Sequence, residues 1–186
     1  MDVLVDDGLF EPEWCRELTY QAASARYELA RVGARASTAS VSSAVRRSAV
    51  SCLPERARIQ FVSRLLLAAR RFERHFGVIV SGVEEPALLR YRPGDHFAPH
   101  RDRCIEPGAD EWARERELTV VVGLCARGSF GGGELLLHRS DGARTSIEVT
   151  EGRTIVFRAE QLHEVAVVTR GERRVVAAWL VGARRA

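Results

Sequence analysis

The stretch Thr119-Val120-Val121-Val122-Gly123-Leu124-Cys125 consists mainly of β-branched and other apolar residues, and it predicts a buried β-strand. Shorter segments of similar character lie on both sides of it and are separated by turn residues. They comprise residues 87–91, 134–138, 145–149, 154–157, 165–168 and 175–180. Short strands at this spacing are typical of a β-sandwich or barrel, so the chain is expected to be mainly β from about residue 87 onward.

The first 80 or so residues have a different pattern and are expected to be largely helical. A first helix is predicted from the Pro12 region to about Ala30, because an early proline and flanking glutamates suit a helix N-terminus. A second is predicted over about 54–76 and ends at Gly77. Its apolar residues recur at spacings of three and four, namely Ile59, Val62, Leu65, Leu66 and Ala69.

Between these helices, residues 33–53 are rich in Ser, Ala and Gly and are expected to be irregular. They include Val45-Arg46-Arg47-Ser48, a candidate short strand. Because the helices precede the strands, we expect them to pack on one face of a β core, in an α+β or mainly β fold.

Length and composition predict one ordinary soluble domain spanning residues 1–186. Apolar residues make up 46% of the chain and charged residues 28%, and no run approaches the roughly 20 apolar residues of a membrane span. The acidic segment 1–7 does not resemble a secretory signal, so a cytoplasmic protein without a membrane partner is expected. The net charge is +3 with both signs interspersed, so no nucleic-acid partner is expected. The four cysteines fit no zinc-site spacing.

The long polar segment 92–117 is unusual for a compact domain unless it is functional. His100 and Asp102 lie two residues apart in it, and side chains at that spacing project to the same face of an extended backbone. Pro99 disfavours a helix here. The spacing therefore predicts that an imidazole and a carboxylate converge on one metal ion. His163, which lies between two strand-like runs downstream, is the candidate third ligand.

Two histidines and one carboxylate on one face leave three octahedral positions open, which is the arrangement expected of non-haem Fe(II) oxygenases. Such a site has room for a bidentate 2-oxo acid and for O2. The distal carboxylate of the 2-oxo acid also needs a partner, and a guanidinium group suits it. Strand alternation places Arg173 on one face together with Val175, Ala177 and Trp179, while Arg174 points the other way. Arg173 is therefore preferred to Arg174.

These residues occur within motifs that resemble the prolyl 4-hydroxylase-like family of 2-oxoglutarate- and Fe(II)-dependent oxygenases. The motifs follow one another in the family's order over about residues 87–181, half of the chain. They are Tyr91-x-x-Gly94-Asp95-x-Phe97-x-x-His100-x-Asp102, Leu118 to Val122, Gly131 to Leu135, Gly152 to Phe157, His163-Glu164-Val165, and Gly171 to Trp179. Residues 10–15 are similar to the opening helix of the family.

The resemblance implies a double-stranded β-helix, or cupin-like jelly roll, over residues 87–181, supported by the mainly helical residues 1–80. It implies Fe(II) ligation by His100, Asp102 and His163, and 2-oxoglutarate binding by Arg173 with a further hydroxyl donor from Tyr91. Related halogenases replace the metal carboxylate with a small residue. Because Asp102 is present, hydroxylation of an unactivated C–H bond is favoured, with release of succinate and CO2 and with ascorbate as a candidate reductant.

The substrate class stays open among amino acids, peptide or protein side chains and small metabolites. Four arginines in the loops before the core are candidates for binding a substrate carboxylate or an acidic peptide, namely Arg46, Arg47, Arg101 and Arg103. Two other functions are kept as alternatives: a non-catalytic 2-oxoglutarate or metal sensor on the same fold, and a zinc-dependent hydrolase or isomerase on a cupin-like barrel.

Overall fold

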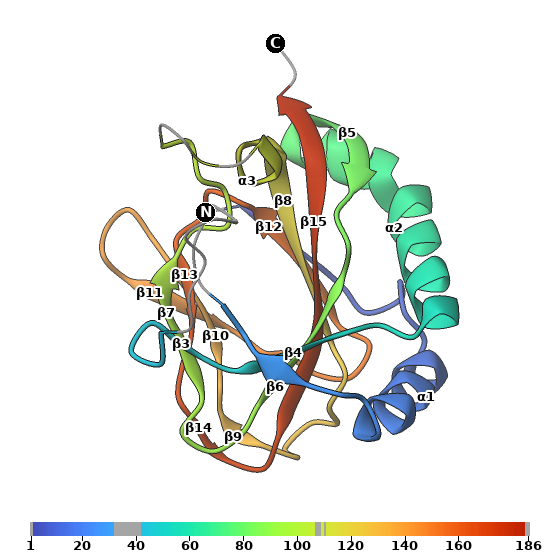
Figure 1. Ribbon diagram of the computed structural model, residues 1–186. Coiled ribbons are helices and arrows are strands. Elements are labelled where there is room, and N and C mark those ends of the chain that lie inside the picture. The colour runs from blue at the N-terminus through green and yellow to red at the C-terminus, as the bar shows by residue number, and fades with distance from the viewer. Residues whose placement is uncertain (1, 32–41, 107–108, 110, 185–186) are drawn as a thin grey trace.

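Two facing β-sheets form the body of the protein, and two helices cover the outside of the larger sheet (Figure 1). The computed structural model describes residues 2–31, 42–106, 109 and 111–184. Residues 33–41 of the expected irregular segment lie outside this description. The named strand pairs are antiparallel, as in a jelly roll.

The larger sheet has the order β1-β12-β8-β15-β6-β4-β2, and β5 pairs with β15 off this path. Its strands are β1 (Val3–Asp6), β2 (Glu28–Leu29), β4 (Ala49–Cys52), β5 (Val78–Val83), β6 (Ala87–Tyr91), β8 (Arg116–Gly123), β12 (Thr154–Arg158) and β15 (Arg173–Arg184). The smaller sheet has the order β11-β10-β13-β7-β3. Its strands are β3 (Arg46–Arg47), β7 (His96–His100), β10 (Leu135–His138), β11 (Arg144–Ile147) and β13 (His163–Val165). A separate pair joins β9 (Gly131–Gly132) to β14 (Val168–Arg170).

Both faces of the larger sheet are buried at β8, which explains the continuous apolar run in that strand. Val120 and Val122 face the helices α1 (Pro12–Ala23) and α2 (Glu55–Phe76), where they join a core with Phe61 and Leu65. Val121 alternates to the opposite face and joins a second core between the two sheets. The helices therefore stabilise one side of the sheet and leave its other side to line the interior of the jelly roll.

The second helix agrees with its sequence prediction, but the first does not. Gly77 ends α2 with a φ of 64°, a left-handed conformation that glycine adopts without strain. The first helix was predicted to about Ala30 and ends at Ala23 instead. Residues Glu28–Leu29 form β2 and pair with β4, so sheet hydrogen bonding replaces helical hydrogen bonding there.

Several strands were not predicted from the sequence. β1 pairs with β12 at one edge of the larger sheet, and β5 pairs with the C-terminal part of β15. The polar segment 92–117 contains β7 and the short helix α3 (Glu111–Glu115). In the part of the chain that the structure describes, no helix is both long and apolar enough to cross a bilayer.

Candidate metal centre

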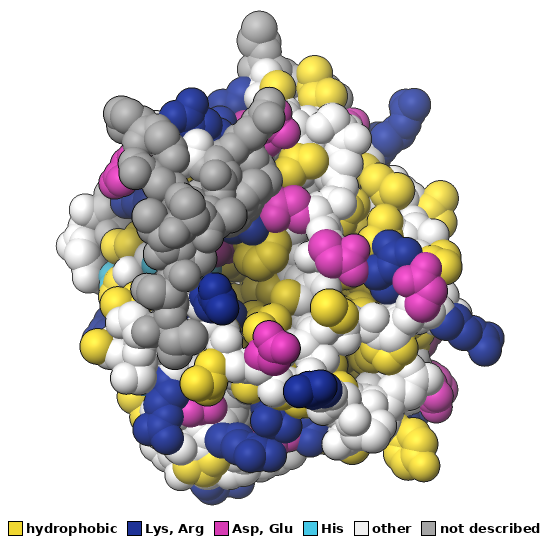
Figure 2. All heavy atoms as spheres, in the orientation of Figure 1, with side chains coloured by type: hydrophobic (Ala, Val, Ile, Leu, Met, Phe, Trp, Pro, Cys, Tyr) yellow, Lys and Arg dark blue, Asp and Glu magenta, His cyan; other side chains and the backbone are white. Residues whose placement is uncertain are grey.

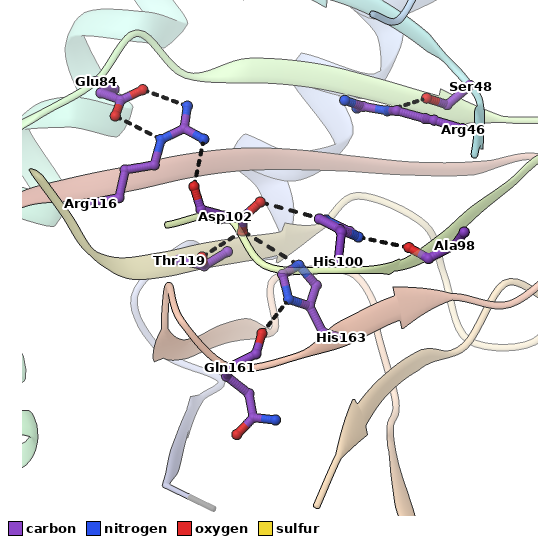
Figure 3. A network of polar contacts seen from close by, with 10 residues as sticks. All are labelled: Arg46, Ser48, Glu84, Ala98, His100, Asp102, Arg116, Thr119, Gln161 and His163. Carbon is purple, nitrogen blue, oxygen red and sulfur yellow. Dashed lines mark hydrogen bonds and ion pairs between the residues drawn. The ribbon is translucent and has the colours of Figure 1, made fainter. Parts of the chain in front are cut away.

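Three side chains from the smaller sheet and the loop after it converge on one point (Figure 3). Antiparallel pairing of β7 with β13 places His163 directly opposite His100. Asp102 follows in a bend, where its backbone N–H donates a hydrogen bond to the carbonyl oxygen of Ala159 at 2.9 Å. One ligand atom from each of the three residues lies within 4.8 Å of the others. We call His100, Asp102 and His163 the triad.

The route by which His100 and Asp102 converge differs from the sequence prediction. An extended backbone through both residues was expected, but β7 ends at His100 and the chain bends before Asp102. The two side chains still meet, with His100 Nε2 3.5 Å from Asp102 Oδ1. This carboxylate is held in place by the bend, by the hydrogen bond to Ala159 and by the neighbouring strand. Strand periodicity does not determine its position.

An irregularity in β7 shapes the wall beside the triad. His163 and Val165 are two residues apart, but their partners His100 and Phe97 are three apart, so β7 carries one extra residue. In a regular strand, residues three apart would face opposite sides of the sheet. Here the ring of Phe97 stacks on that of His100 at a centroid distance of 3.5 Å. The extra residue thus brings an aromatic ring against a candidate metal ligand.

Backbone carbonyl groups fix the tautomers of both histidines. His100 Nδ1 lies 2.9 Å from the carbonyl oxygen of Ala98, and His163 Nδ1 lies 2.8 Å from that of Gln161 (Figure 3). A carbonyl oxygen only accepts hydrogen bonds, so each Nδ1 is the protonated nitrogen. Each Nε2 therefore presents a lone pair toward the centre. In metal-binding histidines, a hydrogen bond from the other ring nitrogen orients the ring in the same way.

The Asp102 carboxylate and the His163 imidazole have the protonation states that a metal requires. Burial opposes ionisation of Asp102, but His163, His100 and the Thr119 hydroxyl group hold the pKa of that carboxyl well below its usual range. The Thr119 hydroxyl donates a 2.6 Å hydrogen bond to Asp102 Oδ2. Burial also lowers the pKa of His163 to about 4. At neutral pH the centre thus offers one anion and a neutral imidazole at position 163.

A cavity of about 440 Å³ opens from the triad into the space between the two sheets. In the space-filling view, an apolar hollow lies near the middle of the molecule with basic side chains at its edge (Figure 2). Apolar side chains from both sheets form much of its wall, namely Leu89, Val121, Leu135, Val165, Val175 and Ala177. Apolar walls lower the effective dielectric constant near the centre, which strengthens electrostatic interactions there.

Arg173 lines this cavity from β15 and is only 1% exposed. Its Nε and Nη1 atoms are buried and have no hydrogen-bond partner among the described residues. Tyr91 is its cross-strand partner on β6, with the guanidinium carbon 5.1 Å from the centre of the tyrosine ring. Burial lowers the pKa of Arg173. A buried cation with unpaired N–H groups is costly, so this position fits an anionic ligand.

Gly133 makes room for this arginine. A Cβ atom at that position would lie 3.0 Å from Arg173 Cδ and 2.8 Å from Val168 Cγ2, and the glycine has a φ of +67°. Both the conformation and the close approach require glycine. Gly133 therefore allows the arginine side chain to reach its position.

Arg174 points away from the cavity, as strand alternation predicted, and pairs with Glu172. Among the other histidines, His96 lies on β7 but does not line the cavity, and its Nε2 is 3.4 Å from the carbonyl oxygen of Ala44. The structure therefore brings together His100, Asp102 and His163, with Arg173 and Tyr91 in the same cavity.

The residues that support the triad carry no recognisable signal of that role in the sequence. The roles of Thr119 and Arg116 depend on contacts with residues that are distant in sequence. Arg116 donates a hydrogen bond to the main-chain oxygen of Asp102 at 3.3 Å and forms an ion pair with Glu84. Its guanidinium carbon lies 3.8 Å from the ring centre of Trp179, whose buried indole N–H has no partner among the described residues. Strand alternation could have placed Thr119 and Trp179 on the cavity face, but it carries no information on these contacts.

The comparisons with known proteins agree with this architecture. Residues 86–181 match the family model of the 2OG-Fe(II) oxygenase superfamily. A PKHD-type hydroxylase of Maricaulis maris is 36% identical over 93 residues, which cover 50% of this chain and 40% of that protein. One from Shewanella oneidensis is 33% identical over 95 residues, covering 51% and 42%. The matched segment thus spans less than half the length of these relatives.

Solved structures show the same fold over nearly the whole chain. A Pseudomonas putida prolyl-4-hydroxylase superposes with a TM-score of 0.74 at 20% identity, covering 96% of this chain and 92% of that one. A Trichoplax adhaerens prolyl hydroxylase, in complex with a hypoxia inducible factor peptide fragment, gives a TM-score of 0.79 at 17% identity, covering 97% and 83%.

The solved structures show a jelly-roll fold, and the family match defines the class of protein. The chain belongs to the 2OG-Fe(II) oxygenase superfamily. Membership gives the cofactors of that family, Fe(II) and 2-oxoglutarate with O2, and it confirms the resemblance and the fold predicted from the sequence.

Proposed function

We propose that this chain is an Fe(II)- and 2-oxoglutarate-dependent hydroxylase, with iron held by His100, Asp102 and His163. Arg173 binds the distal carboxylate of 2-oxoglutarate, and Tyr91 contributes a hydroxyl donor beside it. The reaction hydroxylates an unactivated C–H bond of an amino acid, a peptide or protein side chain, or a small metabolite, and releases succinate and CO2.

One observation carries this proposal. Two Nε2 lone pairs and one carboxylate meet in a cavity that also contains a buried guanidinium group, two of whose nitrogens have no hydrogen-bond partner among the described residues. A metal site alone would not need a buried cation in the same cavity. A cosubstrate that chelates the metal at one end and carries a carboxylate at the other fits both groups at once.

The residues of the chain have separate tasks in this reaction. When bound, Fe(II) supplies the redox chemistry by which 2-oxoglutarate and O2 drive hydroxylation. Asp102, held by Thr119 and ionised at neutral pH, contributes the negative charge of the site. The carbonyl groups of Ala98 and Gln161 keep both imidazoles in the ligating tautomer. Arg173 orients the cosubstrate, and the apolar walls of the cavity exclude water.

The test is succinate formation from 2-oxoglutarate by the purified protein in the presence of Fe(II) and O2. Asp102→Ala removes the carboxylate ligand and is expected to abolish iron-dependent succinate formation. Arg47→Ala removes an exposed arginine that pairs with Asp95 outside the cavity and is expected to leave it unchanged. Iron and 2-oxoglutarate binding without any succinate would instead favour the sensor, and turnover that survives Asp102→Ala would overturn the site assignment.

A further inference from the structure

The cavity wall carries an excess of positive charge. Five arginines line it, whereas the only acidic side chain among its described lining residues is that of Asp102. The arginines are Arg31, Arg46, Arg101, Arg116 and Arg173. Three of them have tasks within the protein or the proposed cosubstrate site. Arg116 pairs with Glu84, Arg101 donates to the carbonyl oxygen of Glu160, and Arg173 faces the 2-oxoglutarate position.

Arg46 and Arg31 remain, and neither forms an ion pair within the described residues. Arg46 belongs to β3, which pairs with β7 so that Arg46 lies opposite Phe97. Its guanidinium carbon lies over the Phe97 ring, 4.5 Å from the ring centre, and Phe97 in turn stacks on His100. One aromatic side chain thus connects this guanidinium group to a candidate iron ligand.

Contacts with the protein use only one edge of the Arg46 guanidinium group. Nε donates a 2.9 Å hydrogen bond to Ser48 Oγ. The described residues place no carboxylate within 4.0 Å of it, whereas its neighbour Arg47 points elsewhere and pairs with Asp95 at 3.1 Å. Stacking on Phe97 and the Ser48 bond fix the plane of the group, and the two Nη atoms are left to donate a pair of parallel hydrogen bonds.

The charge of the centre with Fe(II) and 2-oxoglutarate bound indicates what kind of substrate the free edge of Arg46 can bind. Iron carries two positive charges and Arg173 one, and these are balanced by the Asp102 carboxylate together with the two carboxylates of 2-oxoglutarate. The centre is therefore neutral once loaded, and the charge left in the cavity is that of the arginines near its mouth. A substrate that enters last meets a net positive surface, which attracts an anion.

We propose that the substrate is a small carboxylic acid, and that Arg46 binds its carboxylate through the two Nη atoms beside the iron centre. This inference rests on the proposed function and adds the substrate class to it. A planar, singly charged carboxylate matches the free edge of a planar guanidinium group. Arg31, exposed on the same wall, adds to the positive potential. Arg46 is thus a specificity-determining residue for a reaction that the triad carries out.

The experiment uses the full chain loaded with Fe(II) and 2-oxoglutarate. Its readout is substrate-stimulated succinate formation with a panel of free L-amino acids and straight-chain and aromatic carboxylic acids. Each acid is tested beside its primary amide, which keeps the shape and removes the charge. We expect at least one acid to stimulate turnover, and its amide to be at least tenfold less effective.

Arg46→Gln is then expected to raise the KM of that acid at least tenfold while kcat changes less than threefold. Arg46→Lys keeps the charge without the two parallel donors, and its KM is expected to lie between those of Arg46→Gln and the unmodified protein. The matched control is Arg47→Gln on the adjacent residue, which is expected to leave KM within twofold. Arg46→Gln is also expected to retain the visible charge-transfer band of the Fe(II)–2-oxoglutarate complex, which shows that the variant is folded and loaded.

Three results would overturn the inference: an amide as effective as its acid, equal effects of Arg46→Gln and Arg47→Gln, or turnover with an uncharged peptide and with none of the acids. The charge-transfer band separates this failure from failure of the proposed function. If the unmodified protein gives the band and no acid is preferred, only the substrate class is wrong. If the band is absent, the proposed function fails first.

Discussion

Replacing Arg173 by methionine separates the cosubstrate role of this residue from its effect on stability. The guanidinium group is almost completely buried, and its Nε and Nη1 atoms have no partner among the described residues. If the guanidinium group donates a bidentate pair of hydrogen bonds to the distal carboxylate of 2-oxoglutarate, two charge-assisted hydrogen bonds are lost in Arg173→Met. Each is worth roughly 1.5–3 kcal/mol. A loss of about 3–6 kcal/mol corresponds to roughly two to four orders of magnitude in affinity.

Stability without the cosubstrate is expected to change in the opposite direction. Arg173 is a buried cation whose desolvation is not compensated until an anion binds, and methionine fills similar space without a charge. The free energy of unfolding of the unliganded protein is therefore expected to rise, by about 1 kcal/mol or more. A residue that only supported the fold would lower stability when it was replaced.

Two titrations check this prediction. Anaerobic addition of 2-oxoglutarate to the Fe(II)-loaded protein gives the dissociation constant from the charge-transfer band, and urea unfolding without 2-oxoglutarate gives the stability. Arg173→Lys is the conservative variant and is expected to recover part of the affinity, because it keeps the charge. If Arg173→Met binds 2-oxoglutarate within threefold of the unmodified protein, the assignment of Arg173 is wrong.

Three further predictions concern the surroundings of the site. Thr119→Val removes the hydroxyl donor to Asp102 and is expected to weaken Fe(II) binding by about 10- to 100-fold, measured by metal titration; unchanged affinity would contradict the role of that hydrogen bond. Gly133→Ala introduces a Cβ contact of 2.8 Å, whereas a Cβ atom in the control Gly142→Ala, also at positive φ, meets no atom within 4 Å. Both variants are strained, but only Gly133→Ala is expected to weaken 2-oxoglutarate binding. Equal binding in the two variants would refute the claim that Gly133 makes room for Arg173. Burial raises the pKa of the Cys15 thiol to about 11, so about one molecule in a thousand is a thiolate at pH 8; mass spectrometry after iodoacetamide treatment is expected to find Cys15 unmodified until the protein is unfolded in urea, and rapid labelling of the folded protein would contradict its burial.

The elements that the sequence predicted well are those whose signal is local. The apolar spacing in residues 54–76 and the glycine that follows define α2 closely. Alternation in β15 correctly separates Arg173 in the cavity from Arg174 outside it. The strand run at residues 119–125 corresponds to β8, whose two buried faces account for its lack of polar alternation.

The elements that were missed depend on contacts between distant residues. The predicted helix stops before Glu28 because β4 offers a hydrogen-bonding partner to Glu28–Leu29, and local propensity does not contain that partner. The extra residue in β7 is defined by its register with β13. The histidine and carboxylate spacing indicated which residues meet, but the bend before Asp102 and the Thr119 hydroxyl group that orients it required the folded chain.

The central claim is that His100, Asp102 and His163 together hold iron, and an anaerobic titration tests it most directly. Fe(II) and then 2-oxoglutarate are added to the unmodified protein and to His100→Ala, Asp102→Ala and His163→Ala. His96→Ala is the matched control, because it removes a histidine from the same strand as His100 but outside the cavity. We expect the charge-transfer band in the unmodified protein and in His96→Ala, and its loss in the other three variants. A band of full intensity in folded His100→Ala, Asp102→Ala or His163→Ala would contradict the account.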